Sequence, residues 1–146
     1  MAVKLVKPIN HKKVVKITNQ DFEAKMRELR VNSDIAVAVS GGPDSLALMH
    51  LSNRYALNNN INLTVLSIDH GIRADSSKEI VWLKKVAKKN KINFYSTKLK
   101  KKINSSNTLS KARTLRYEAL SKYCNKKKIK FLLTAHHLDD EIENFL

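Results

Sequence analysis

Residues 34–45, with the sequence DIAVAVSGGPDS, decide the fold of this 146-residue chain. The run 34–39 is short, apolar and partly β-branched, which is typical of a buried strand. Two glycines follow and allow a tight turn, and leucine and methionine then recur at helical spacing from Asp44 to about Leu57. A buried strand that leads through a glycine turn into a helix predicts an α/β fold.

The same alternation continues along the chain. An earlier helix, capped by Thr18 or Asn19, is predicted to end near Arg30, and residues 1–17 are predicted to be an extension that Pro8 interrupts. Further strands are predicted at 63–68, 92–97 and 130–135, and further helices at 76–90, at 107–125 and from His137 onward. Four apolar strands separated by helices predict a doubly wound, mainly parallel sheet with helices on both faces and right-handed crossovers.

Basic residues are concentrated in one part of the chain. The chain has 28 Lys and Arg against 13 Asp and Glu, which gives a net charge of +15. Residues 78–130 hold 18 of these basic residues and only two acids, Glu79 and Glu118. This block favours a polyanion partner such as RNA. The alternative is a lysine-rich genome bias, since 22 Lys stand against 6 Arg.

Composition also excludes several classes of protein. No apolar run approaches the ~20 residues that a membrane span needs, and the N-terminus lacks the apolar core of a signal peptide. The single cysteine, Cys124, excludes an internal disulfide, a Cys-x-x-Cys redox pair and a multi-cysteine metal site built from this chain. We therefore expect a protein of the reducing cytoplasm that has no membrane partner.

Polar clusters follow three of the four predicted strands. They are SGGPDS at 40–45, DHGIR at 69–73 and TAHHLDDE at 134–141. Parallel strands end at the same edge of a sheet, and open α/β sheets bind ligands at that edge. The sequence therefore predicts one site built from all three clusters.

The SGGPDS cluster has the composition of a phosphate-binding loop. Its glycines allow close approach of the backbone to a phosphate, and the free amides of the helix start, with the Ser40 and Ser45 hydroxyls, form an anion nest. The cluster lacks the Gly-Lys-[Ser/Thr] sequence of a Walker A loop. A carboxylate at Asp44 fits beside phosphates when it meets Mg²⁺. A plain strand-to-helix turn is the alternative.

Two arginines and several strand-end residues complete the candidate site. On the helix predicted at 107–125, Arg116 falls near the centre of the apolar face and Arg113 at its edge. A guanidinium directed at a core needs an anionic partner, either a phosphate or, as the alternative, a structural carboxylate. Asp139 is the candidate second carboxylate, although the helix dipole alone also favours acids there.

Four segments carry a resemblance to known families. SGGPDS resembles the pyrophosphate loop of the N-type ATP-pyrophosphatase (PP-loop) superfamily. IDHGIR at 68–73, KARTLRY at 111–117 and TAHHLDDE at 134–141 are similar, in order and spacing, to segments of the N-terminal catalytic domain of the tRNA(Ile)-lysidine synthetase family. Asn144 departs from the family, which usually has Thr there.

The resemblance implies a fold, a reaction and a set of site residues. It implies an adenine nucleotide α-hydrolase-like sheet, with an N-terminal extension and helix at 1–31 and a PP-loop ATP-binding catalytic domain, incomplete at its C-terminus, at 32–146. The implied catalytic residues are Asp44, Asp139 and Arg113, with Asp44 and Asp139 holding Mg²⁺. The implied ATP-binding residues are Ser40, Gly41, Gly42, Pro43, Asp44, Ser45, Asp69, His70, Arg116 and His136.

The implied reaction joins lysine to the wobble cytidine of a tRNA(Ile) whose anticodon is CAU, using ATP. The implied partners are that tRNA and lysine, and association into a homodimer is left open. Three other functions stay open at this point. They are a tRNA thiolase of the same superfamily, a metal-dependent phosphoesterase built on the Asp and His residues of the strand ends, and an RNA-binding module without catalysis.

Overall fold

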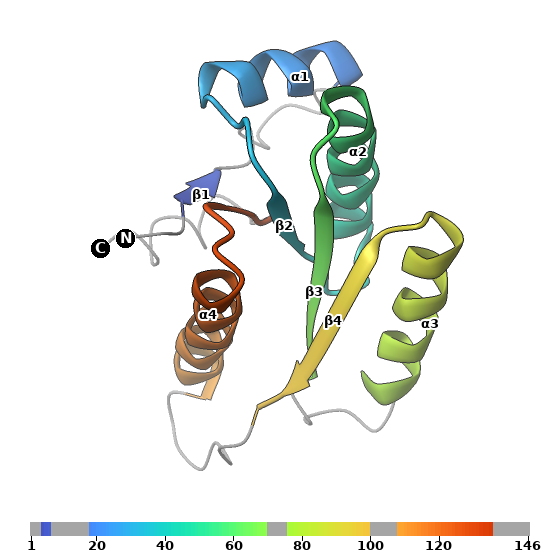
Figure 1. Cartoon of the computed structure of the whole chain (residues 1–146). Helices are drawn as coiled ribbons and strands as arrows, with labels where there is room; N and C mark the ends of the chain where they lie inside the picture. Colours follow the sequence, from blue (N-terminus) through green and yellow to red (C-terminus); the bar gives the residue numbers. More distant parts are fainter. Residues whose placement is uncertain (1–3, 7–17, 70–75, 100–107, 136–146) are drawn as a thin grey trace.

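The computed structural model describes residues 4–6, 18–69, 76–99 and 108–135 (Figure 1). The helices in these ranges are α1 (Asn19–Glu28), α2 (Pro43–Asn59), α3 (Ser76–Lys89) and α4 (Thr108–Lys126). The strands are β1 (Lys4–Val6), β2 (Ile35–Ala38), β3 (Leu63–Asp69), β4 (Asn93–Lys98) and β5 (Phe131–Leu133). The predicted strands and helices within the described ranges are confirmed to within a few residues at their ends.

The described strands form one parallel sheet in the order β1–β5–β2–β3–β4. Ile35 of β2 lies opposite Leu63 of β3 on one side and Phe131 of β5 on the other. The chain therefore proceeds from β2 outward through β3 to β4, and then returns to the other side of β2 as β5. This reversal makes the boundary between β2 and β5 the topological switch point, where doubly wound sheets bind their ligands.

Strand β1 corrects one prediction. Residues 1–17 were expected to be an extension, but Lys4–Val6 pair in parallel with β5, with Lys4 opposite Phe131. The prediction is therefore wrong at these three residues. A strand this short owes its conformation to the neighbouring strand, because β-propensity reflects packing and pairing more than local sequence. Pro8, which was expected to interrupt the extension, lies outside the described residues.

Alternate residues of the strands pack into two separate cores. Ile35, Val37, Leu63 and Val65 share one buried cluster with side chains of α1, α2 and α3. The intervening residues share a second buried cluster with α4, which covers the opposite face of the sheet (Figure 1); its strand members are Ala36, Leu66 and Leu132. Apolar side chains on both faces explain why the strands read as continuous apolar runs. Helices on both faces confirm the predicted fold class.

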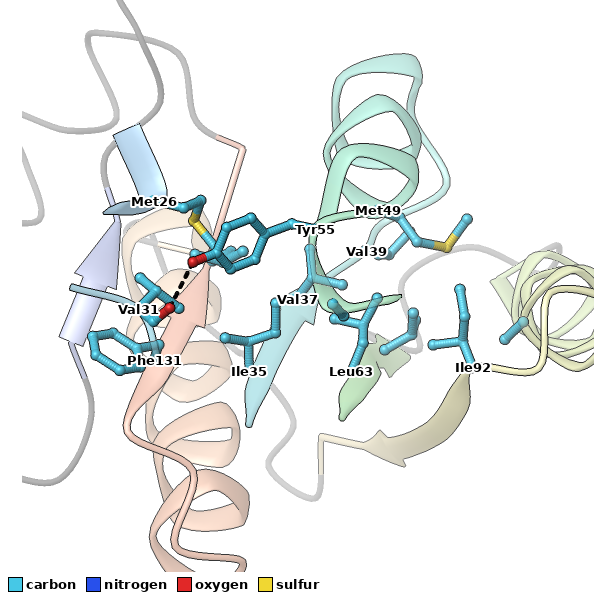
Figure 2. Close-up of a cluster of buried hydrophobic side chains, with 14 of the residues drawn as sticks. Met26, Val31, Ile35, Val37, Val39, Met49, Tyr55, Leu63, Ile92 and Phe131 are labelled. Carbon is cyan, nitrogen blue, oxygen red and sulfur yellow. Dashed lines mark hydrogen bonds between the residues drawn. The ribbon is translucent and has the colours of Figure 1, made fainter. Parts of the chain in front are cut away.

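Helix α2 is held to the sheet by more than apolar contacts. The hydroxyl of Tyr55, on its last turns, donates a hydrogen bond of 2.7 Å to the buried carbonyl oxygen of Val31 (Figure 2). Tyr55 is 3% exposed, and its ring meets that of Phe22 of α1 edge to face. The bond satisfies two polar groups that burial would otherwise penalise, so it fixes α2 relative to the start of β2.

Helix α1 begins with a side-chain cap, as predicted. The Thr18 hydroxyl accepts a hydrogen bond from the Asp21 amide at 3.1 Å, and the Asp21 carboxylate accepts one from the Thr18 amide at 3.1 Å. The Asp21 carboxylate also accepts a hydrogen bond of 2.8 Å from the Thr18 hydroxyl, and this bond, followed by that from the Thr18 amide, lowers the pKa of Asp21. The amides at this helix start are therefore satisfied within the protein.

Candidate functional site

The loop after β2 is a turn closed on itself by two serines. The Ser45 hydroxyl accepts a hydrogen bond from the Ser40 amide at 3.2 Å and donates one to the Gly42 carbonyl at 3.1 Å. The Gly42 amide donates to the Ser40 hydroxyl at 3.4 Å. Gly41 has a φ of 96°, in the left-handed region that favours glycine. The predicted loop residues Ser40, Gly42 and Ser45 are thus brought together as one rigid turn.

The first turn of α2 presents its amides without a side-chain cap. Its N-cap residue is Gly42, which makes no side-chain hydrogen bond, and Pro43 takes the first helical position. This differs from α1, whose start is closed by Thr18. The open amides and the helix dipole attract negative charge, so an anion fits beside them. The loop follows β2, which places this helix start at the switch point of the sheet.

Asp44 follows Pro43, with its side chain exposed at the helix start. A hard divalent cation is commonly held by one or two carboxylates together with the phosphate oxygens of a nucleotide. An exposed carboxylate beside open helix amides fits that chemistry, so Mg²⁺ with Asp44 as a ligand is compatible with the donors present. Asp139, the predicted second ligand, lies outside the described residues. Within the described ranges there is no group of three His, Cys, Asp or Glu side chains suited to a metal ion.

Asp69 ends β3 at the same edge and is 4% exposed. Its carboxylate accepts a long hydrogen bond, 3.5 Å, from the hydroxyl of Ser77 at the beginning of α3. Its carbonyl accepts a hydrogen bond of 3.1 Å from the Leu99 amide, just beyond β4. Asp69 therefore anchors the start of α3 and the end of β4 at the carboxyl edge. His70 and His136, predicted to lie near the nucleotide, are outside the described residues.

Two buried hydroxyl residues lie at this edge; Thr134 belongs to the predicted cluster at 134–141, whereas Ser67 was not among the predicted site residues. Ser67, near the end of β3, is 4% exposed, and Thr134, just after β5, is also 4% exposed. The signal in the sequence is a hydroxyl side chain at the end of an otherwise apolar strand. Ser67 is on β3 and Thr134 follows β5, the strands on either side of β2, so both hydroxyl groups are buried close to strand ends that neighbour β2.

Arg113 and Arg116 lie on the inward side of α4, as predicted. Both side chains are half-buried, and Arg116 precedes the buried Leu120 by one helical turn. The Arg116 guanidinium carbon lies 5.7 Å from the ring centroid of Tyr117. Helix α4 begins at the end of the sheet to which the strands point (Figure 1), and Arg113 is in its second turn.

Cys124, near the end of α4, is buried, and its thiol is poorly reactive. Its side chain is fully buried, and burial raises the pKa of its thiol to about 11. At pH 8 only about a thousandth of such a thiol is the reactive thiolate.

We therefore expect an aromatic disulfide reagent to label Cys124 at pH 8 only as fast as the protein unfolds. The labelling rate is measured by the absorbance of the released aromatic thiol at increasing urea concentration. Rapid labelling without urea would contradict this placement.

No helix of the described ranges combines the length and the apolar character needed to cross a membrane.

Comparisons with known proteins match most of the chain. The family profile described as the PP-loop domain matches residues 10–146. The tRNA(Ile)-lysidine synthase of Rickettsia bellii (strain OSU 85-389) is 48% identical over 113 residues, which cover 77% of this chain and 26% of that protein. The same enzyme from Rickettsia typhi is 40% identical over 129 residues, which cover 86% of this chain and 30% of that protein. The chain thus spans less than a third of the length of these relatives.

Among solved structures, the U34-tRNA thiolase NcsA from Methanococcus maripaludis, with its [4Fe-4S] cluster, superimposes with a TM-score of 0.70. It is 26% identical in sequence, and the match covers 83% of this chain and 46% of that one. The parallel sheet, the glycine turn at its switch point and the profile match over residues 10–146 agree, and the chain belongs to the PP-loop domain family.

Proposed function

We propose that this chain is the ATP-binding part of an enzyme that ligates lysine to the wobble cytidine of a tRNA(Ile) with a CAU anticodon. The observation that carries the proposal is the turn at residues 40–45, which ends in open helix amides at the switch point of the sheet. The lysidine synthases that are 40–48% identical over most of the chain support the choice of substrate. We place the activity in the cytoplasm, where its tRNA substrate would be found.

The reaction has two steps, and each releases a phosphate-containing leaving group, pyrophosphate in the first and AMP in the second. In the first, the C2 oxygen of the cytidine attacks the α-phosphorus of ATP, and the bond to pyrophosphate breaks. In the second, the ε-amine of lysine attacks C2 and loses a proton, and the C2–oxygen bond breaks to release AMP. The first step is needed because C2 is a poor electrophile until its oxygen carries a phosphoryl group.

The residues of the loop have defined tasks in the first step. The amides at the start of α2 and the Ser40 hydroxyl bind the departing pyrophosphate, whose charge the helix dipole stabilises, while the Ser45 hydroxyl holds the turn in place through the Ser40 amide and the Gly42 carbonyl. Asp44, with Asp139 in our proposal, holds Mg²⁺, which when bound neutralises phosphate charge. Arg113 and Arg116, on the first turns of α4, supply further positive charge in this proposal.

A thiolase of the same superfamily is the second candidate, because the solved structure reported above is a U34-tRNA thiolase. Iron–sulfur clusters are held by cysteine thiolates. The only cysteine of this chain, Cys124, is fully buried, and its pKa of about 11 keeps it a thiol. Cys124 is therefore not suited to hold a cluster. We favour the ligase because the lysidine synthases are 40–48% identical to this chain, whereas the thiolase is 26% identical.

The test is the dependence of AMP and pyrophosphate release on each substrate. We expect release only when ATP, lysine and tRNA(Ile) with a CAU anticodon are all present, and a tRNA whose mass increases by one lysyl group. The matched control is the same tRNA with uridine in place of the wobble cytidine. Uridine keeps the C2 carbonyl but has N3–H and a C4 carbonyl where cytidine has an unprotonated N3 and a 4-amino group, so its C2 oxygen is a weaker nucleophile and should give no product. Equal turnover with both tRNAs, or product formation without ATP, would overturn the proposal.

A further inference from the structure

The outer face of α3 is basic and carries a solvent-exposed tryptophan. The inner face of α3 packs Leu83 and Ala87 against the sheet. On the opposite face Trp82 is 48% exposed and Val81 is 54% exposed, although both are large apolar side chains. All five lysines of the helix are exposed. Trp82 and Val81 are thus large apolar side chains left about half exposed among lysines, a combination that suits a partner with both apolar and anionic groups.

Four of these residues form a line along the helix. Lys78, Trp82, Lys85 and Lys89 follow one another at intervals of four, three and four positions, so they share one side of α3. We call these four residues the α3 stripe. It is about 16 Å long, because a helix rises 1.5 Å per residue. Glu79, the acid of this helix, precedes Trp82 by three positions and so borders the stripe on one side, where it is outnumbered by the three lysines.

The stripe begins beside the candidate site. Ser77, the residue before Lys78, donates its hydroxyl hydrogen bond to Asp69 at the carboxyl end of β3. Helix α3 begins at the end of the sheet to which the strands point and runs back along the side of β3 and β4 (Figure 1). A substrate with one nucleotide at the edge of the sheet can therefore continue along α3.

We propose that the α3 stripe binds an unpaired segment of RNA, with one base stacked on the Trp82 indole and the flanking phosphates beside Lys78, Lys85 and Lys89. This inference rests on the proposed function for the identity of the RNA, since a wobble nucleotide lies in an unpaired loop. Unpaired RNA is bound through aromatic stacking platforms flanked by basic side chains. The α3 stripe has that composition, with one exposed ring between cations on either side.

Charge decides against an apolar protein partner on this face. A protein that covered Trp82 and Val81 would also desolvate neighbouring lysines, which costs free energy unless acidic groups are placed opposite them. RNA has bases that can cover the exposed ring and one phosphate per nucleotide that can lie opposite the lysines, so it satisfies the apolar and the charged parts of this surface together. In the stripe, cations stand on both sides of one ring, just as phosphates stand on both sides of each base along a strand.

Trp82 is the only tryptophan of the chain, so its fluorescence reports on this face alone. The probe is an anticodon stem–loop RNA with CAU in its loop, added without ATP or lysine, and its binding is measured separately by the anisotropy of a dye on the RNA. We expect quenching of Trp82 and protection from acrylamide over the same concentration range as binding. A fully paired RNA of equal length should bind by charge alone and leave the fluorescence unchanged.

Substitutions separate stacking from charge. We expect Trp82→Ala to weaken stem–loop binding by about 5- to 100-fold, and Trp82→Phe to retain most of the affinity because a ring remains. We expect Lys85→Ala to lower the slope of log K against log salt by about 0.7. Leu57→Ala on α2, whose side chain is 73% exposed, is the control for loss of exposed apolar surface, and Lys127→Ala beyond α4 is the control for loss of charge from the same basic block.

The α3 stripe proposal would be overturned if Trp82→Ala bound the stem–loop as tightly as the unchanged chain, or if Trp82 fluorescence did not change in the bound complex. Neither result would affect the ligation proposal. Equal losses of affinity in Leu57→Ala and Trp82→Ala would also overturn the α3 stripe proposal, because stacking would then have no special part. Quenching and the expected variant losses, in a protein that shows no lysine ligation, would overturn the proposed function and leave the α3 stripe as an RNA-binding surface.

Discussion

We expect a Gly41→Val variant to bind ATP about 10- to 100-fold more weakly, because a β-branched residue at this position strains the backbone by about 1–3 kcal/mol. Gly41 has a φ of 96°, and a Cβ built there meets no atom within 4 Å, so the penalty comes from the backbone conformation and not from crowding. The turn can relieve the strain only by moving the amides that face the phosphates. Calorimetric titration with a non-hydrolysable ATP analogue measures the loss.

Gly42→Ala is the matched control for this experiment. Gly42 has a φ of −69°, which any residue adopts, and its added Cβ would meet only the Ser40 hydroxyl, at an ordinary 3.6 Å. We expect this variant to lose less than tenfold in affinity, with the circular dichroism of both variants unchanged. If Gly41→Val bound the analogue as tightly as the unchanged chain, the turn at residues 40–45 would not be the phosphate site.

The sequence was most informative where local and tertiary requirements agree. Strand β2, the glycine turn and α2 were predicted because an apolar run, two glycines and a helical pattern stand next to one another, and each favours the same structure. The Thr18 cap was predicted for the same reason, since capping chemistry involves only neighbouring residues. The inward placement of Arg113 and Arg116 followed from helical periodicity.

Features that depend on distant residues were not predictable in the same way. Strand β1 is three residues long, and only its pairing with β5 makes it a strand. The position of β5 beside β2 is set by a long crossover, which no local pattern specifies. This position matters for function, because it places the turn at residues 40–45 at the switch point. The roles of Asp139, His70 and His136 remain predictions, because these residues lie outside the described ranges.

We expect Asp44→Asn to lower the kcat of AMP formation by about 100- to 1,000-fold while the protein stays folded, which is the size of effect seen when one group that stabilises transition-state charge is removed. The asparagine side chain keeps the size of Asp44 but loses the negative charge with which Asp44 holds Mg²⁺ in our proposal. Because the Asp44 side chain is exposed, its replacement leaves the core untouched. The measurement is kcat at saturating ATP, lysine and tRNA, at several Mg²⁺ concentrations.

Glu79→Gln separates this role from a simple interaction with the helix dipole. Glu79 is an exposed acid in the first turn of α3, as Asp44 is in the first turn of α2, so each variant removes a similar dipole interaction of about 0.3–1 kcal/mol. Thermal melts should therefore shift by a similar small amount in both variants, whereas only Asp44→Asn should lose turnover. A kcat for Asp44→Asn within threefold of that of Glu79→Gln would mean that Asp44 serves only the helix, and that the metal ligands of this site must be sought among other residues.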